Sequence, residues 1–147
     1  MSMELQIQQD IKAAMLAKEK VRLESLRAIK AAILLAKTAD GSESIADEAV
    51  VKIIQKLVKQ RKETAEIYKQ QNREELAAQE LAEAAAMEVY LPKQMSEEEL
   101  EAELKKIIAQ VGATGPQDMG KVMGTATKAL AGKAEGRMIS AMVKKLL

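Results

Sequence analysis

Glycine and basic residues gather near the carboxyl end of the chain, and they are the residue types here best suited to bind a ligand. Six of the seven glycines lie from Gly112 to Gly136, and only Gly41 lies elsewhere. Glycine destabilises a helix by about 1 kcal/mol relative to alanine, yet Gly120 and Gly124 interrupt a segment of helical periodicity. Two explanations are open: a second helix packs closely against this spacing, as is commoner in soluble domains, or a ligand approaches the backbone.

Basic side chains follow the same segment at helical spacing. Lys121, Thr125 and Lys128 share one face of the expected helix, and Arg137 and Lys144 share a face of the next one. Residues 118–147 contain six basic and two acidic residues, a net charge of +4. A helix start with glycine and lysine nearby can bind phosphate. An ordinary solvated lysine face is the alternative.

Several kinds of catalytic site are excluded by composition. The chain has no Cys and no His, which excludes disulfides, the usual zinc sites and Ser-His-Asp triads. The five glutamates from Glu97 to Glu103 spread around the first turns of a helix, where they favour the helix dipole rather than a metal. The glycine-lysine run lacks the spacing of a P-loop. We therefore predict no catalytic residue, no metal site and no cofactor.

The helix-forming composition predicts an all-α protein of two parts. A bundle of about four helices, one of them long, is expected over residues 1–94, and a three-helix subdomain over residues 95–147. Pro92 ends the last helix of the bundle. The expected helices are Leu5–Ala17, Val21–Ala36, Ile45–Gln71, Arg73–Tyr90, Ser96–Val111, Pro116–Ala131 and Arg137–Leu147.

Local signals predict details of these elements. Lys18–Lys20 is expected to be a break or bend, and Ser44 is expected to cap the long helix. Ser96 and Glu99 have the spacing of a capping box. Arg61 falls in an apolar stripe, where an ion pair with a nearby glutamate is expected. The candidates are Glu63, Glu66 and Glu80. The methionine pairs, Met119 with Met123 and Met138 with Met142, are expected to fill the core.

The remaining composition bears on location. No stretch approaches 18 apolar residues, so no membrane span is expected. The chain also shows no signal-peptide pattern and no cysteine, which fits a cytoplasmic protein.

Four motifs closely resemble the GatB/YqeY domain. They are the run from Tyr90 to Gln94 (YLPKQ), the capping box with its helix start at 96–100 (SEEEL), the run from Asp118 to Gly124 (DMGKVMG), and the run from Gly132 to Gly136 (GKAEG). Leu26, Arg27 and the segment 59–63 (KQRKE) further resemble stand-alone YqeY-like proteins. Glu135 departs from the family, which commonly has Asp there.

The resemblance implies an all-helical protein whose C-terminal part is similar to the tail of the B subunit of the glutamine-dependent tRNA amidotransferase. That tail contacts tRNA, which implies a tRNA-binding accessory module here with no independent catalysis. Its partners would be tRNA and an amidotransferase or an aminoacyl-tRNA synthetase. The candidate RNA-contact residues are Gly120, Lys121, Gly124, Lys128, Lys133, Gly136, Arg137 and Lys144.

Two other functions stay open. Family annotation implies carbon–nitrogen ligase activity with glutamine as amido-N-donor, although the chain lacks the large catalytic part of the amidotransferase subunit. A helical protein-interaction module is the other alternative, with the long helix 45–71 and the methionine pairs as its docking face.

Overall fold

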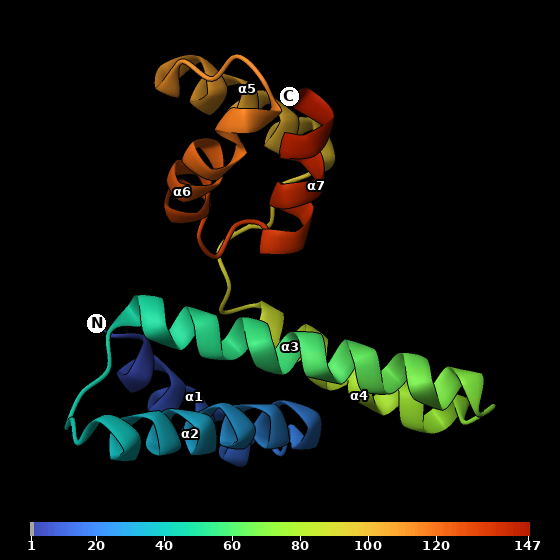
Figure 1. The fold of residues 1–147 in the computed structure, drawn as a ribbon. Coiled ribbons are helices and arrows are strands. Elements are labelled where there is room, and N and C mark those ends of the chain that lie inside the picture. Colours follow the sequence, from blue (N-terminus) through green and yellow to red (C-terminus); the bar gives the residue numbers. More distant parts are fainter. Residues whose placement is uncertain (1) are drawn as a thin grey trace. The chain divides into compact units, whose positions relative to one another are not determined.

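The computed structural model describes residues 2–147, and this part of the chain is all-helical with no β-strand (Figure 1). The all-α prediction is therefore confirmed. Contacts divide the chain into a first unit, which ends at Leu91, and a C-terminal unit, Pro92–Leu147. The helices are α1 (Met3–Ala17), α2 (Lys20–Asp40), α3 (Asp47–Gln70), α4 (Glu74–Glu88), α5 (Glu97–Val111), the short 3₁₀ turn η1 (Pro116–Asp118), α6 (Met119–Ala129) and α7 (Gly136–Leu146).

The first unit packs α1 to α4 around one apolar core. The long helix α3 forms a hairpin with α4, and α2 packs on both α4 and α1 (Figure 1). Burying one large aliphatic side chain stabilises a fold by roughly 1.5–3 kcal/mol, so a core of this size can hold the four helices together. Its buried residues are Ile7, Ala14, Leu26, Ile29, Ile33, Val50, Ile54, Val58, Ala84 and Met87.

The break between α1 and α2 lies where the charged segment predicts it. Lys18 takes a left-handed conformation with φ 56°, and its N–H bonds back to the carbonyls of Ala14 and Met15. Gly41 ends α2 in the same way, with φ 68°. Both ends satisfy carbonyls that a helix terminus otherwise leaves free.

The predicted cap at the start of the long helix is wrong. The N-cap of α3 is Ala46, whose side chain can accept no hydrogen bond, and Ser44 lies two residues too early. Asp47 instead accepts a hydrogen bond from the backbone N–H of Met3 at 3.0 Å. This hydrogen bond ties the start of α1 to the start of α3.

Arg61 lies in an ion-pair cluster between α3 and α4. Its Nε is 3.7 Å from Glu80 Oε2 and 3.5 Å from Glu83 Oε2. Glu80 was among the expected partners, whereas Glu83 was not, and neither Glu63 nor Glu66 pairs with Arg61 among the described residues. Desolvation raises the pKa of Glu83, against the lowering effect of Arg61.

The C-terminal unit has its own core, formed by α5, α6 and α7. The buried residues are Leu100, Leu104, Ile107, Val122, Ala126, Leu130, Ala134, Ile139 and Val143. Ser96 caps α5, because its Oγ accepts the Glu99 N–H at 3.1 Å. The Glu99 carboxylate accepts from the Ser96 hydroxyl at 3.2 Å and not from the Ser96 backbone N–H, so among the described residues one of the two bonds of the predicted capping box forms. Gly112 ends α5 with φ 69°.

Candidate nucleic-acid interface

Helix α6 buries one face and exposes its glycines and lysines. Val122 and Ala126 are buried, whereas Gly120, Lys121, Gly124 and Lys128 are exposed. This follows from helical periodicity, because the buried pair is spaced i, i+4 and the exposed residues flank it.

The two glycines of α6 have no packing neighbour in the C-terminal unit. A Cβ atom added at Gly120 or at Gly124 would meet no described atom within 4 Å beyond its chain neighbours and the nearby backbone of α6 itself. Of the two explanations left open by the sequence, close packing of a second helix against these glycines does not hold within this unit. The glycines leave an open strip of backbone at the surface of α6.

Helix α7 is oriented by Ile139 and Val143, which are buried in the core of the C-terminal unit. Gly136, Arg137 and Lys144 are exposed as a result. Met138 was expected to face the core, but it is 39% exposed and lies one position before buried Ile139. The other three members of the two methionine pairs are partly buried and pack against the core. They are Met119, Met123 and Met142.

The bend between α6 and α7 is held in place by the start of the unit. Gln94 Nε2 donates to the Gly132 carbonyl at 2.8 Å, and Met95 N donates to the Lys133 carbonyl at 2.9 Å. Gly132 has φ 80°, a left-handed conformation that glycine adopts easily. These bonds fix the backbone at Lys133 and leave its side chain exposed. In the sequence, Gln94 ends a family motif and lies with Met95 at the expected boundary, and no local signal shows this contact.

The structure thus places all eight candidate residues at the surface of two contacting helices and the bend between them. Within residues 2–147, none of the five basic candidates forms an ion pair. Lys145, which was not a candidate, is also exposed. The side chain of Glu135 does not cap α7, and none of the other described side chains does so.

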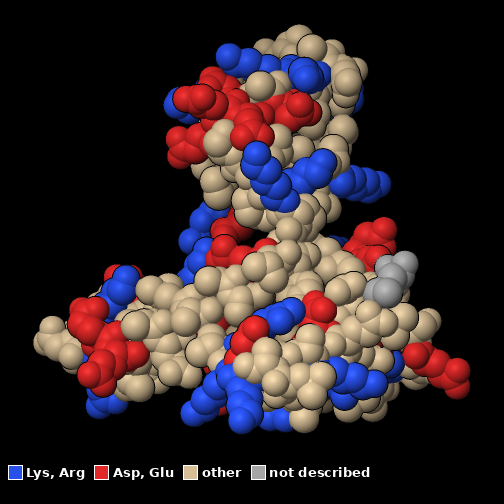
Figure 2. Space-filling view, turned by 180° about the vertical axis from the view of Figure 1, so that it is seen from behind, with Lys and Arg blue, Asp and Glu red and all other residues tan. Residues whose placement is uncertain are grey.

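Charge is divided between the helices of this unit. The acidic residues lie mainly on α5, where Glu101 pairs with Lys105 at 3.4 Å and Glu103 pairs with Lys106 at 3.3 Å. Figure 2 shows acidic side chains gathered on the smaller unit, with basic side chains beside them. An anionic ligand would be repelled by the first turns of α5 and attracted by the basic residues of α6 and α7.

The described residues contain no group of three or more acidic, His or Cys side chains arranged to hold a metal ion. Over the same residues, none of the helices combines the length and the apolar character needed to cross a membrane.

Fold and site together define an all-helical protein in which a separately packed C-terminal unit exposes glycine and basic residues. Residues 4–147 match the family described as Yqey-like protein, and the chain belongs to this family. This confirms the family expected from the sequence motifs. The chain is also similar to "Altered inheritance of mitochondria protein 41, mitochondrial" of Meyerozyma guilliermondii, with 36% identity over 122 residues. The match covers 80% of this chain and 63% of that protein.

Proposed function

We propose that the C-terminal unit is a tRNA-binding accessory module that contacts the RNA backbone through α6, the bend and α7. One observation carries this proposal: Gly120 and Gly124 lie in open space beside exposed lysines. Gly124 weakens the interior of α6 by about 1 kcal/mol relative to alanine, and Gly120, in its first turn, weakens it by less. Packing in the unit does not require them, whereas a phosphate or ribose that approaches the α6 backbone would.

The composition favours a structured RNA over a single strand. Single-strand binding usually stacks bases on aromatic side chains, but the only aromatic residues, Tyr68 and Tyr90, belong to the first unit. Double-stranded RNA is instead recognised through phosphates and 2′-hydroxyls. Because of the resemblance to the amidotransferase tail, we propose tRNA as the structured RNA that binds. An amidotransferase or an aminoacyl-tRNA synthetase would then supply the chemistry, in the cytoplasm.

The test is an anisotropy titration of labelled total tRNA with the full chain at low salt. The double variant Lys121→Glu/Lys128→Glu should bind at least ~10-fold more weakly. The slope of log affinity against log salt concentration should be smaller by about two, because two phosphate contacts are lost. The matched control is Lys105→Glu/Lys106→Glu, which makes the same charge change on α5. This control should change affinity by about 2-fold at most, because α5 lies outside the proposed contact.

Two results would contradict the proposal. One is the absence of binding by the unmodified chain at low salt. The other is an equal loss in both double variants, which would show that net charge rather than α6 attracts the RNA. Amidated product formed by the chain alone from glutamine, ATP and mischarged tRNA would replace the accessory role with the ligase alternative.

A further inference from the structure

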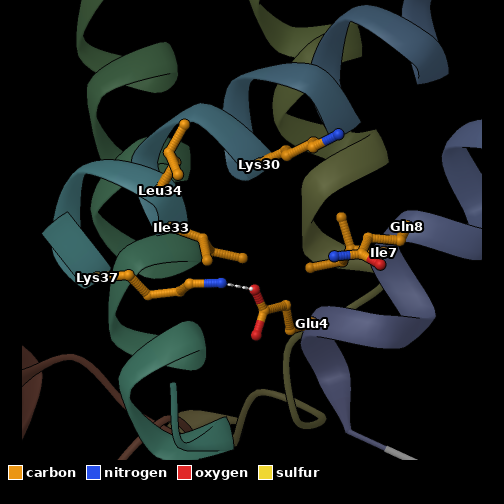
Figure 3. Close-up of a pocket in the computed structure, with 7 residues that line it drawn as sticks. All are labelled: Glu4, Ile7, Gln8, Lys30, Ile33, Leu34 and Lys37. Atoms are coloured by element: carbon orange, nitrogen blue, oxygen red, sulfur yellow. Dashed lines mark hydrogen bonds and ion pairs between the residues drawn. The ribbon is translucent and has the colours of Figure 1, made fainter. Parts of the chain in front are cut away.

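A second candidate binding surface lies in the first unit, between α1 and α2. A cavity of about 200 Å³ that opens to solvent lies between the two helices (Figure 3). Its floor is apolar, because Ile7 and Ile33 are buried there, and Leu34 forms part of its wall. Glu4 and Lys37 form an ion pair across one end. An apolar cavity of about 150 Å³ holds a molecule as large as benzene, so this one can accept an apolar side chain.

Helical periodicity places further exposed residues of α1 and α2 beside the cavity, and we call the cavity together with these residues the α1–α2 groove. On α1, Met15 continues the face of Glu4 by helical periodicity and is 53% exposed. On α2, Arg27 and Lys30 share a face with Leu34, which is 59% exposed. The groove therefore combines an apolar floor, exposed apolar side chains and basic residues along its α2 side.

The charge of the groove is positive. Arg27, Lys30 and, on α1, Lys12 are exposed, and none of them forms an ion pair within the described part of the chain. The one acidic residue that lines the cavity, Glu4, is already paired with Lys37. An occupant that carries acidic side chains beside an apolar stripe would complement this surface.

We propose that the α1–α2 groove binds an amphipathic helix of a partner protein, with an apolar stripe on the floor and acidic residues opposite Arg27 and Lys30. Two adjacent helices offer a third helix ridges and grooves into which its side chains interdigitate, as in helix-in-groove recognition. The floor is recessed, because Ile7 and Ile33 are 1% and 3% exposed whereas Leu34 beside them is 59% exposed. A projecting leucine can reach such a floor, whereas a planar lipid surface meets only the rims.

The experiment uses the full chain and a labelled probe peptide of about 18 residues, long enough for about five helical turns. Its leucines occupy one face and its glutamates the flanks, and a second peptide replaces the glutamates by lysines. The glutamate peptide should bind at least ~10-fold more tightly than the lysine peptide. Arg27→Glu/Lys30→Glu should abolish this preference.

The matched variants are Leu34→Asp and Leu35→Asp. Leu35 is 73% exposed but lies about 100° further around α2, away from the groove. Leu34→Asp should weaken binding of the glutamate peptide by ~10-fold or more, and Leu35→Asp by about 2-fold at most. Circular dichroism checks that both variants keep the helicity of the parent chain.

Three outcomes would overturn the proposal: no saturable binding of the glutamate peptide, equal binding of both peptides, or equal effects of the two leucine variants. Vesicles of phosphatidylglycerol provide a further arm. If the vesicles bind the chain, Leu34→Asp weakens this binding, and the glutamate peptide does not bind, the surface belongs to an anionic membrane instead.

Discussion

Tyr90 shows how single side chains join distant parts of the first unit. Its hydroxyl donates to Asp10 Oδ2 at 2.6 Å, which links the end of α4 to α1 across 80 positions of sequence. Burial, and then the hydrogen bond to Asp10, raise the pKa of Tyr90 to about 12. The folded state therefore favours the neutral phenol over the phenolate.

This shift predicts how stability depends on alkaline pH. Tyr90 contributes fully to the stability of the fold below pH 10, which is the ordinary pKa of a tyrosine. This contribution is lost as the pH rises towards the folded-state pKa of about 12. Tyr90→Phe should lower the free energy of unfolding by about 1 kcal/mol at neutral pH, because Asp10 loses a donor. It should also flatten the decline above pH 10 relative to the parent chain. Urea unfolding at several alkaline pH values measures both effects, and parallel pH curves for the two proteins would contradict the assignment.

At the scale of an element, helix α6 carries two glycines, which are poor helix formers, on its exposed face. Gly120 and Gly124 have room for a side chain, whereas Gly112, at the end of α5, has φ 69°. A left-handed conformation is unfavourable by roughly 1–2 kcal/mol for a residue with a Cβ atom. The three glycines thus serve different purposes, and alanine substitution separates them.

Gly120→Ala/Gly124→Ala should stabilise α6 by about 1 kcal/mol at Gly124 and by less at Gly120, which lies in the first turn, and should raise the melting temperature. Gly112→Ala should lower the melting temperature, because the alanine would have to adopt the left-handed conformation that Gly112 has at the end of α5. If the glycines admit an RNA backbone, the stabilised double variant should bind tRNA more weakly than the parent chain. Thermal unfolding and the anisotropy titration on the same samples measure both. Unchanged tRNA affinity in the double variant would remove the main support for the proposed contact.

At the scale of the whole molecule, each unit has its own core. The core of the C-terminal unit draws only on residues from Met95 onwards, and that of the first unit only on residues up to Leu91. Hydrogen bonds from Gln94 and Met95 to the bend between α6 and α7 lie wholly within the C-terminal unit. We therefore propose that the two units fold as separate domains.

A fragment of residues 92–147 should accordingly be helical and unfold cooperatively, although with modest stability because small cores bury less surface. It should retain the tRNA affinity of the full chain within about 3-fold, since the proposed contacts are all present. A fragment that ends at residue 91 should not bind tRNA. Circular dichroism and anisotropy measure these properties. A disordered C-terminal fragment would show that its core depends on the first unit.

The sequence alone determined the fold class and most helix ends. Gly112, Pro116 and the Ser96–Glu99 pair act on backbone groups only a few positions away, so their effect can be predicted locally. The expected break at Lys18 formed for the same reason. Glycine and lysine spacing also singled out the candidate residues of α6 and α7, which the structure exposes.

Tertiary structure alone decided which surfaces are covered and which side chains meet. Periodicity could not tell whether Gly120 and Gly124 face a helix or open space, because that depends on how three helices pack. It also could not show that Asp47 would bond to Met3 or that Glu83 would join Arg61. The α1–α2 groove exists only because two separate helices lie side by side. Such contacts join residues far apart in the chain, and no local pattern specifies them.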